Sequence, residues 1–328
     1  MSVFFTSIQS VLAIVLMIAV GYFAQKVGFF GKDFSNSLSK LIMKIALPLA
    51  IFNSMLENFN PTVLSRLGAG LIYVIIAVAI DYVIAFLLTR VFRVPRGKRG
   101  LMIQAFTGAN TVFIGMPLNN ALFGTSAIPY LLVYYIVNTI VIWTVGVWVI
   151  ANDDPTVKGR NDNVKFDLSH LLPVPLYGFI VALPFIYIEP LKHFYMNLTF
   201  LSNTFVPNMG ALVTPLSLIY IGIMLQQFGL KNMKFDRHIS LTLIGRFVIS
   251  PIVMTIVILV GAHALGFELT SIFQKTLIIQ SATPTLAVLP IMANEYHGDV
   301  KFATNVVVSS SVLFVIVVPI VMILQSAL

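Results

Sequence analysis

Long apolar runs separated by short polar segments follow one another along almost the whole chain. A helix needs about 20 apolar residues to cross a lipid bilayer, and ten of the runs approach that length. The pattern therefore predicts an all-α membrane protein with ten transmembrane helices. The predicted spans are residues 3–25, 38–57, 67–89, 100–122, 127–150, 169–188, 205–227, 239–262, 271–294 and 302–325.

The fourth of these runs, Leu101–Phe123, has an interrupted middle. Gly108 and Asn110 lie near its centre, and Gly115 and Pro117 follow. Glycine and proline weaken the hydrogen bonding of a helix interior, and nearby polar side chains can satisfy the backbone groups that are freed. A helix that opens inside the membrane presents unpaired backbone groups and a partial charge to a polar cargo. We therefore predict that this stretch is half of a binding site.

The second half of the chain repeats the first. Leu101–Asn110 resembles Leu277–Leu286. The aligned pairs are Gln104 with Gln280, Thr107 with Thr283, and Gly108 with Pro284. Five spans per half is an odd number, so the second copy enters the membrane inverted. An inverted 5+5 repeat with broken helices 4 and 9 crossing at mid-membrane is the architecture of secondary transporters, including sodium–proton antiporters and bile-acid symporters.

The repeat also defines the organisation of the chain and its expected hinges. Residues 1–151 form the first repeat, residues 152–167 a polar cytoplasmic linker, and residues 168–328 the second repeat. The second and seventh spans share a proline in similar surroundings. The predicted hinge and crossover residues are Gly108, Gly115, Pro117, Pro284, Pro290, Pro48 and Pro215.

Composition and charge exclude several classes of function. The chain is 58% hydrophobic and 10% charged, which agrees with a polytopic membrane protein. It has no cysteine, which rules out disulfides and thiolate metal sites, and it contains no H-E-x-x-H motif. No metal, other cofactor or enzymatic activity is expected. Most basic residues fall in alternate loops, so the net charge of +8 reflects positive-inside topology with both termini outside, rather than nucleic-acid binding.

Two segments resemble signatures of the auxin efflux carrier family. These are Asn110–Leu118, and Pro284-Thr285 followed by Asn294–Asp299. The family includes plant auxin exporters and bacterial permeases for malate and related acids, and the short central linker favours a bacterial permease in the cell membrane. The resemblance implies a scaffold domain of spans 1, 2, 6 and 7 and a transport domain of spans 3–5 and 8–10. It also implies elevator-type movement and a homodimer formed through the scaffold domain.

Four polar residues flank the predicted breaks: Asn110, Thr111, Thr283 and Thr285. Their amide and hydroxyl groups, together with half-helix N-termini, suit a carboxylate. The alternative is that they only satisfy the backbone around the breaks.

Two charged residues are predicted to lie inside spans. Arg246 could hold a dianionic cargo, because a guanidinium donates two parallel hydrogen bonds to a carboxylate. Alternatively it pairs with Asp81, which lies at a similar depth. Asp81 could instead be a proton carrier. The sequence leaves these possibilities open.

The remaining polar residues in spans are weaker candidates. Asn138 and Asn53 could line the site, and the symmetric pair Gln104 and Gln280 has either a binding or a packing role. The run Ser309–Ser311 is typical of close helix packing.

The sequence therefore predicts a carrier of small organic anions, with malate as the leading cargo, that works by alternating access across the bilayer. Two alternatives remain. One is an efflux carrier for auxin-like aromatic or other monocarboxylic weak acids. The other is a sodium- or proton-coupled antiporter or symporter, although neither break has an acidic residue close by to bind a cation.

Overall fold

The computed structural model describes residues 2–31, 33–157, 174–229, 233–264 and 268–326. Residues 158–167 of the predicted linker and residues 169–173 of the sixth predicted span lie outside the described residues. The described part is helical and contains no strand, which confirms the all-α prediction.

The helices of the first half of the chain match the apolar runs closely. They are α1 (Ser2–Lys26), α2 (Phe34–Leu41), η1 (Ile42–Ala46), α3 (Leu47–Asn58), α4 (Pro61–Val91), α5 (Arg99–Thr107), η2 (Thr111–Gly115), α6 (Met116–Phe123), η3 (Thr125–Ala127), α7 (Ile128–Val141), η4 (Ile142–Gly146) and α8 (Val147–Asn152).

Among the described residues of the second half, one helix, α10, was not predicted by the apolar pattern. The helices of this half are α9 (Pro175–Tyr187), α10 (Glu189–Asn197), η6 (Phe200–Phe205), α11 (Val206–Ala211), α12 (Val213–Phe228), α13 (Arg237–Ile244), η8 (Gly245–Ile249), α14 (Ser250–Ala264), α15 (Ser271–Ser281), α16 (Leu289–Glu295) and α17 (Val300–Ser326).

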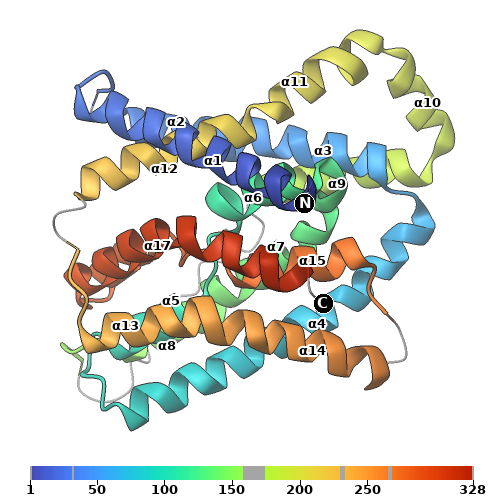
Figure 1. The fold of residues 1–328 in the computed structure, drawn as a ribbon. Helices are drawn as coiled ribbons and strands as arrows, with labels where there is room; N and C mark the ends of the chain where they lie inside the picture. The colour runs from blue at the N-terminus through green and yellow to red at the C-terminus, as the bar shows by residue number, and fades with distance from the viewer. Residues whose placement is uncertain (1, 32, 158–173, 230–232, 265–267, 327–328) are drawn as a thin grey trace.

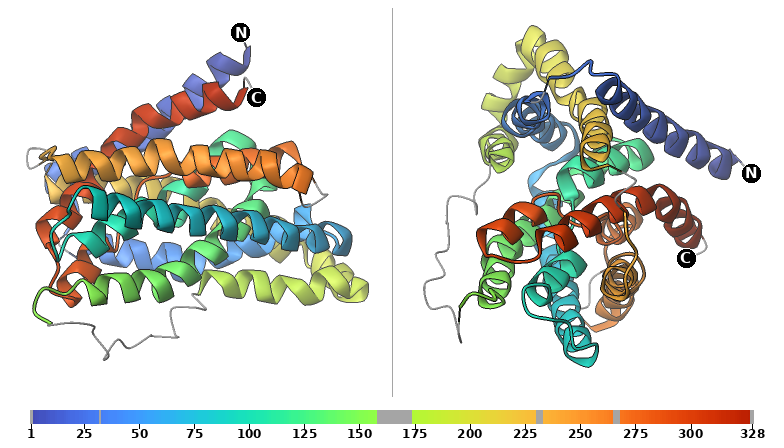
Figure 2. Two further views of the ribbon diagram at one scale, coloured as in Figure 1. Left: turned by 90° about the horizontal axis from the view of Figure 1, so that it is seen from below. Right: turned by 90° about the vertical axis from the view of Figure 1, so that its left-hand side faces the viewer.

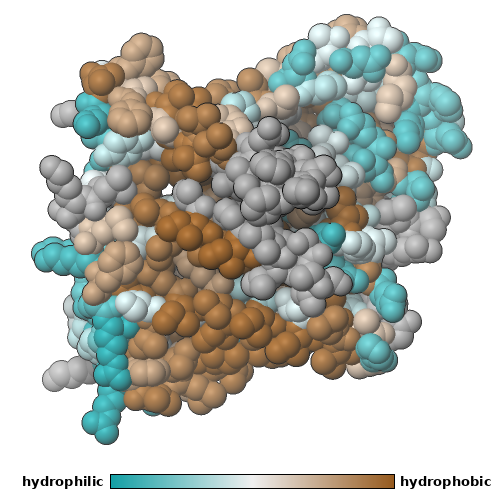
Figure 3. All heavy atoms as spheres, in the orientation of Figure 1, coloured by the Kyte–Doolittle hydropathy of each residue, from teal (hydrophilic) through white to brown (hydrophobic). Residues whose placement is uncertain are grey.

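Several of these helices have the length and composition of membrane spans. Five helical stretches of the described residues qualify: Phe34–Asn58, Gly70–Val91, Thr125–Asn152, Phe200–Gln227 and Arg237–Ala264. Shorter apolar stretches are Val15–Lys26, Pro175–Tyr187 and Val300–Phe314. In Figure 1 many of these helices run across the view, and Figure 2 shows several lying side by side. Hydrophobic side chains cover much of the middle of the face in Figure 3, with hydrophilic ones towards its left and right ends.

Among the described residues, four helices contain a π-helical turn that ends two residues before a proline. The prolines are Pro48, Pro117, Pro207 and Pro251, after η1, η2, η6 and η8. Proline has no N–H to donate and its ring displaces the carbonyl of the preceding turn, so the local hydrogen bonding widens. These prolines therefore distort the helices without ending them.

The helices form two packed groups. In the first, α1 packs along α12, and α3 packs against α9 and α11. In the second, α4 packs against α5, α7 and α14, and α15 against α7 and α14. The two groups occupy the upper and lower parts of Figure 1.

Glycines bring α1 and α12 of the first group into backbone contact. A Cβ on Gly21 would lie 2.1 Å from the Ile219 carbonyl oxygen, and one on Gly222 would lie 2.0 Å from the Ile18 carbonyl oxygen. Small residues allow such close approach between apolar helices in a membrane. The contact therefore depends on the absence of a side chain at both positions.

Basic residues gather where α5, α13 and α17 begin, and we call this side the basic end. The Lys98 ammonium lies 3.3 Å from the Asp299 carboxylate, which joins the start of α5 to the start of α17. The Arg237 guanidinium lies 4.8 Å from the ring centroid of Phe92. These contacts connect loops from both halves of the chain.

Also at the basic end, Asp153 and Asp154 follow α8. Burial raises the pKa of Asp153, although its carboxylate accepts a hydrogen bond from the Gly100 N–H at 2.8 Å. Burial alone would also raise the pKa of Asp154. Hydrogen bonds from Thr156 and His297 outweigh this effect, so the pKa of Asp154 is lowered. Asp154 therefore remains charged beside the His297 ring, 3.0 Å away.

Candidate functional site

Two helices stop near the centre of the molecule and resume after a short non-helical segment. The first, α5, ends at Thr107, and helical structure begins again at Thr111. Gly108 has extended backbone angles, with φ −80° and ψ 117°. The second, α15, ends at Ser281, and α16 begins at Leu289. Each interruption leaves backbone donors and acceptors without partners in their own helix.

The two non-helical segments satisfy each other. The Asn110 N–H donates to the Pro284 carbonyl at 2.8 Å, and the Leu286 N–H donates to the Gly108 carbonyl at 3.1 Å. Ala109 and Thr285 lie opposite each other in an isolated antiparallel bridge. We call residues 108–110 and 284–286 the crossing. A buried open backbone is tolerated here because each segment pairs with the other.

Asn138 of α7 completes the first segment. Its Oδ1 accepts from the Ala109 N–H, and its Nδ2 donates to the Ala109 carbonyl, both at 3.0 Å. A carboxamide carries one acceptor and one donor group side by side, so it matches both polar groups of one residue. Asn138 therefore positions the crossing through Ala109.

Arg246 of η8 binds the ends of both interrupted helices. Its Nη1 donates to the carbonyls of Phe106 at 3.1 Å and Thr107 at 2.9 Å. Its Nε donates to the Thr283 carbonyl at 2.7 Å and its Nη2 to the Gln280 carbonyl at 3.2 Å. The side chain is only 1% exposed. Helix C-termini carry partial negative charge, so this guanidinium is an electrostatic partner to α5 and α15 together.

Asp81 has a different partner. Its Oδ2 accepts a hydrogen bond from the Ser250 hydroxyl at 2.6 Å, which links α4 to α14. Its Oδ1 has no hydrogen-bond partner, and no ion pair joins it to Arg246 among the described residues. In this conformation the Arg246 guanidinium is used on backbone carbonyls and the Asp81 carboxylate on a hydroxyl.

The symmetric glutamines are buried on either side of the crossing. The Gln104 Oε1 accepts from the Tyr82 hydroxyl at 2.7 Å. The side-chain oxygen and nitrogen of Gln280 have no hydrogen-bond partner in the described residues. A Cβ on Gly115 would lie 2.2 Å from the Gln280 Oε1, so the absence of a side chain there makes room for the glutamine.

Asn110 borders open space on both sides of the crossing. Its Oδ1 accepts from the Phe113 N–H at 3.2 Å and so caps the helix that begins at Thr111. On one side lies a cavity of about 210 Å³, which we call the crossing cavity. It is lined by Met43, Asn110, Thr111, Phe113, Tyr135, Asn138, Thr139, Trp143 and Ala287, among others. On the other side lies a narrow pocket of about 20 Å³, bordered by Asn110, Tyr220, Met224, Val308 and Ser311, among others.

Comparison with known proteins shows which family the chain belongs to. Residues 6–322 match the family described as membrane transport protein. The chain belongs to this family. The resemblance to auxin efflux carriers is confirmed, and the protein is a transporter and not an enzyme.

Two relatives are similar along most of their length. An uncharacterized transporter of Methanothermobacter thermautotrophicus is 21% identical over 322 residues, which cover 97% of this chain and 98% of the relative. An uncharacterized transporter of Methanocaldococcus jannaschii is 20% identical over 305 residues, which cover 90% of this chain and 91% of the relative. Both are described as transporters, with no cargo given.

The other predicted site residues of this membrane transport protein differ in their hydrogen-bond partners and in whether they line a cavity. The Thr283 hydroxyl donates to the Gln280 carbonyl at 2.8 Å, and the buried Thr285 hydroxyl has no hydrogen-bond partner among the described residues. Asn53 donates to Glu57 at 2.8 Å within α3 and does not line the crossing cavity or the narrow pocket. Pro48, Pro215 and Pro290 lie in the first turns of α3, α12 and α16.

Several residues at the site did not stand out in the sequence. Tyr135, Thr139 and Trp143 line the crossing cavity from α7 and η4, and Met43 lines it from η1. Their spacing along α7 and η4 resembles that of any apolar helix face, so no signal separated them from lipid-facing residues. Ser310 accepts from the Thr285 N–H at 3.4 Å and is part of the serine run assigned to packing. No cluster of three or more His, Cys, Asp or Glu side chains that could hold a metal occurs among the described residues.

Proposed function

We propose that this membrane transport protein carries small organic anions and binds them beside Asn110 and Thr111 at the crossing. The observation behind the proposal is a cavity of about 210 Å³ that opens against the start of a helix. The first N–H groups of a helix lack intrahelical acceptors and carry partial positive charge, which favours an anion. None of the described residues that line this cavity is acidic.

The proposed topology is an inverted repeat of ten spans with both termini outside. The packing supports it, because α1 lies on α12 as α9 lies on α3, and α4 lies on α5 as α14 lies on α15. In an inverted repeat α9 corresponds to α1, α12 to α3, α14 to α4 and α15 to α5, so each contact has its equivalent in the other repeat. Basic residues gather where α5, α13 and α17 begin, so the positive-inside rule assigns the basic end to the cytoplasm.

The proposed mechanism is movement of a transport domain past a scaffold domain. The first packed group, built on α1, α3, α9 and α12, corresponds to the scaffold, through which we also propose a homodimer. The second group holds Arg246, Asn138 and both interrupted helices. Because these residues bind the crossing through backbone atoms of their own group, the crossing can move as one body while its contacts to α12 change.

In this proposal Arg246 positions the crossing instead of touching the cargo. Its four acceptors are carbonyls at the C-terminal ends of α5 and α15. The groups left to face a carboxylate are the Asn110 amide, the Thr111 hydroxyl and the N–H groups of the turn beginning at Thr111. Such neutral donors suit a single carboxylate of a small acid such as malate.

A second candidate cargo is an aromatic monocarboxylic acid of the auxin type. The observation that favours it is the aromatic lining of the crossing cavity, which includes Phe113, Tyr135 and Trp143. Aromatic rings stack on one another in offset or edge-to-face arrangements. A flat aromatic acid would place its ring against these side chains and its carboxylate at Thr111.

The test is uptake by the purified protein in proteoliposomes. Radiolabelled malate is supplied under imposed electrical and pH gradients, with malonate, lactate, succinate and indole-acetate as competitors. Saturable malate uptake that the small acids suppress supports the first cargo class. Poor malate uptake with strong transport of indole-acetate supports the second class. If no carboxylate crosses under any gradient, the proposed function is wrong.

Replacing Asn110 with alanine should weaken transport of every carboxylate tested. The change removes the cap on the Phe113 N–H and a polar group that borders both sides of the crossing. Losing a helix cap costs about 1 kcal/mol, and losing a contact to a charged ligand about 1.5–3 kcal/mol. We expect KM to rise at least about tenfold. Asn53→Ala, which removes a carboxamide from α3, is the matched control and should leave KM unchanged.

A further inference from the structure

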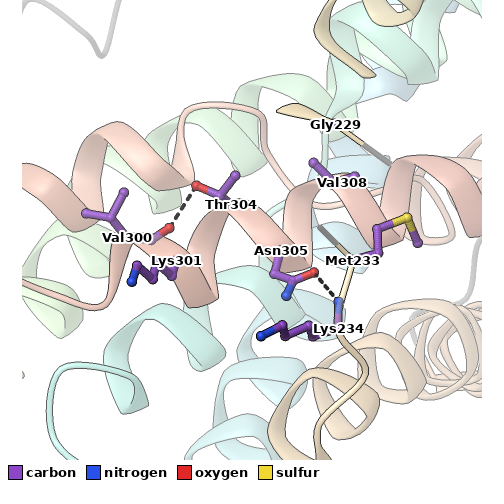
Figure 4. A pocket seen from close by; sticks show the side chains of 8 residues that line it. All are labelled: Gly229, Met233, Lys234, Val300, Lys301, Thr304, Asn305 and Val308. Carbon is purple, nitrogen blue, oxygen red and sulfur yellow. Dashed lines mark hydrogen bonds between the residues drawn. The ribbon is translucent and has the colours of Figure 1, made fainter. Parts of the chain in front are cut away.

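A larger cavity lies at the basic end, away from the crossing. Its volume is about 430 Å³. One wall is Gly229, just after α12, and Met233 and Lys234, just before α13; the other is the first turns of α17, with Lys301 and Thr304. Figure 4 shows these side chains around the cavity and the hydrogen bond from the Lys234 N–H to Asn305, 3.1 Å long.

The charges on this cavity are all positive. Lys234 and Lys301 line it, and none of the described residues that line it is acidic. Neither ammonium has an ion-pair partner among the described residues. The nearest acids along the chain are engaged elsewhere, because Asp299 pairs with Lys98 and Asp236 caps the Ile239 N–H. The start of α17 adds the positive end of a helix of 27 residues.

Val308 of α17 lines both this cavity and the narrow pocket that reaches Asn110. The two spaces therefore border the same helix, one at the basic end and one beside the proposed binding residues.

We propose that this cavity is a basic vestibule that captures small carboxylate anions at the cytoplasmic mouth and supplies them to the crossing. The proposal rests on the function proposed above, because it names a second subsite for the same cargo. A cleft lined by one sign of charge raises the local concentration of oppositely charged ligands and speeds their association. Its walls combine Gly229, just after the scaffold helix α12, with residues just before α13 and in the first turns of α17.

The absence of cysteine from the chain allows the charge of the vestibule to be measured without transport. Thr304→Cys places a single thiol on its wall, and Asn36→Cys places one on an exposed position of α2. The measurement is the ratio of modification rates by a sulfonate-bearing and an ammonium-bearing methanethiosulfonate reagent. We expect this ratio to be about tenfold higher at position 304, and to fall towards that at position 36 in high salt.

The lysines are tested in the same thiol background. Adding Lys234→Gln and Lys301→Gln should remove most of the excess ratio at position 304. The control pair Lys26→Gln and Lys40→Gln removes the same charge from exposed positions that do not line the cavity and should leave the ratio high. Equal ratios at positions 304 and 36, or equal effects of the two lysine pairs, would overturn the vestibule.

Malate then connects the vestibule to the proposed function. Malate should slow modification at position 304, and the Lys234→Gln and Lys301→Gln pair should raise KM several-fold for transport from the basic end only. A high sulfonate preference without malate uptake would retain an anion-attracting cavity and reject malate as the cargo. If malate is taken up with a KM that the two lysine substitutions do not change in either direction of transport, the proposed function stands and the vestibule is wrong.

Discussion

Arg246→Met should abolish transport and lower the melting temperature of the purified protein. Methionine fills a similar volume but leaves the carbonyls of Phe106, Thr107, Gln280 and Thr283, at the ends of α5 and α15, without their donor. An unsatisfied buried polar group costs about 1–3 kcal/mol. The free energy of unfolding should therefore fall by at least about 3 kcal/mol, even where water replaces part of the hydrogen bonding. The C-terminal ends of two helices would also face each other without a cation between them. The uptake rate and the melting temperature should therefore fall together.

Arg246→Lys is the informative companion variant. Lysine keeps the charge but lacks the planar fork that reaches carbonyls on both helices, so we expect intermediate stability and transport below about a tenth of wild type. Direct contact between Arg246 and the cargo would give a different combination of stability and transport. If Arg246→Met kept wild-type stability and lost only dicarboxylate transport while monocarboxylates still crossed, Arg246 would bind substrate.

Most of the described helices coincide with apolar runs, whereas the partners of the polar residues did not follow from the sequence. Gly108 and Pro284 lie in the non-helical segments that follow α5 and α15, and their effect on a helix is local. The acceptors of Arg246 could not be identified in this way. Phe106 and Gln280 look like ordinary helix residues, and their carbonyls become available only because two distant segments end side by side.

Depth along a span did not indicate the hydrogen-bond partners of the two buried charges. Asp81 is close enough to Arg246 for the two charges to interact, but its carboxylate accepts from the Ser250 hydroxyl, one helical turn after Arg246. The Arg246 guanidinium donates instead to backbone carbonyls beside the crossing. The unpredicted helix α10 has a related cause. It is short and polar on one face, so apolar run length gave no sign of it.

Asn138 has a structural role that its sequence position did not indicate. Its place in the middle of a span made it a candidate to line the site, and it borders the crossing cavity. Its carboxamide also accepts from and donates to the two polar groups of Ala109. The side chain therefore shapes the backbone beside Asn110 and Thr111.

Asn138→Asp should therefore have an effect far larger than its size suggests. At neutral pH the carboxylate can still accept from the Ala109 N–H, but it places an oxygen against the Ala109 carbonyl, where an NH₂ group had donated. A lost bond and a repulsive contact in a buried site should lower stability by about 2–4 kcal/mol and transport by at least about a hundredfold. Asn152→Asp, which changes the same donor at the end of α8, should have little effect.

The pH dependence of Asn138→Asp separates this explanation from a general loss of folding. A protonated carboxyl group has one donor and one acceptor, so it can reproduce both bonds that Asn138 makes to Ala109. Stability and transport of the variant should thus be highest at low pH and fall as the pH rises and the group ionises, when each is compared with wild type at the same pH. A defect of equal size across the whole pH range would mean that Asn138 acts by something other than its pair of bonds to the crossing.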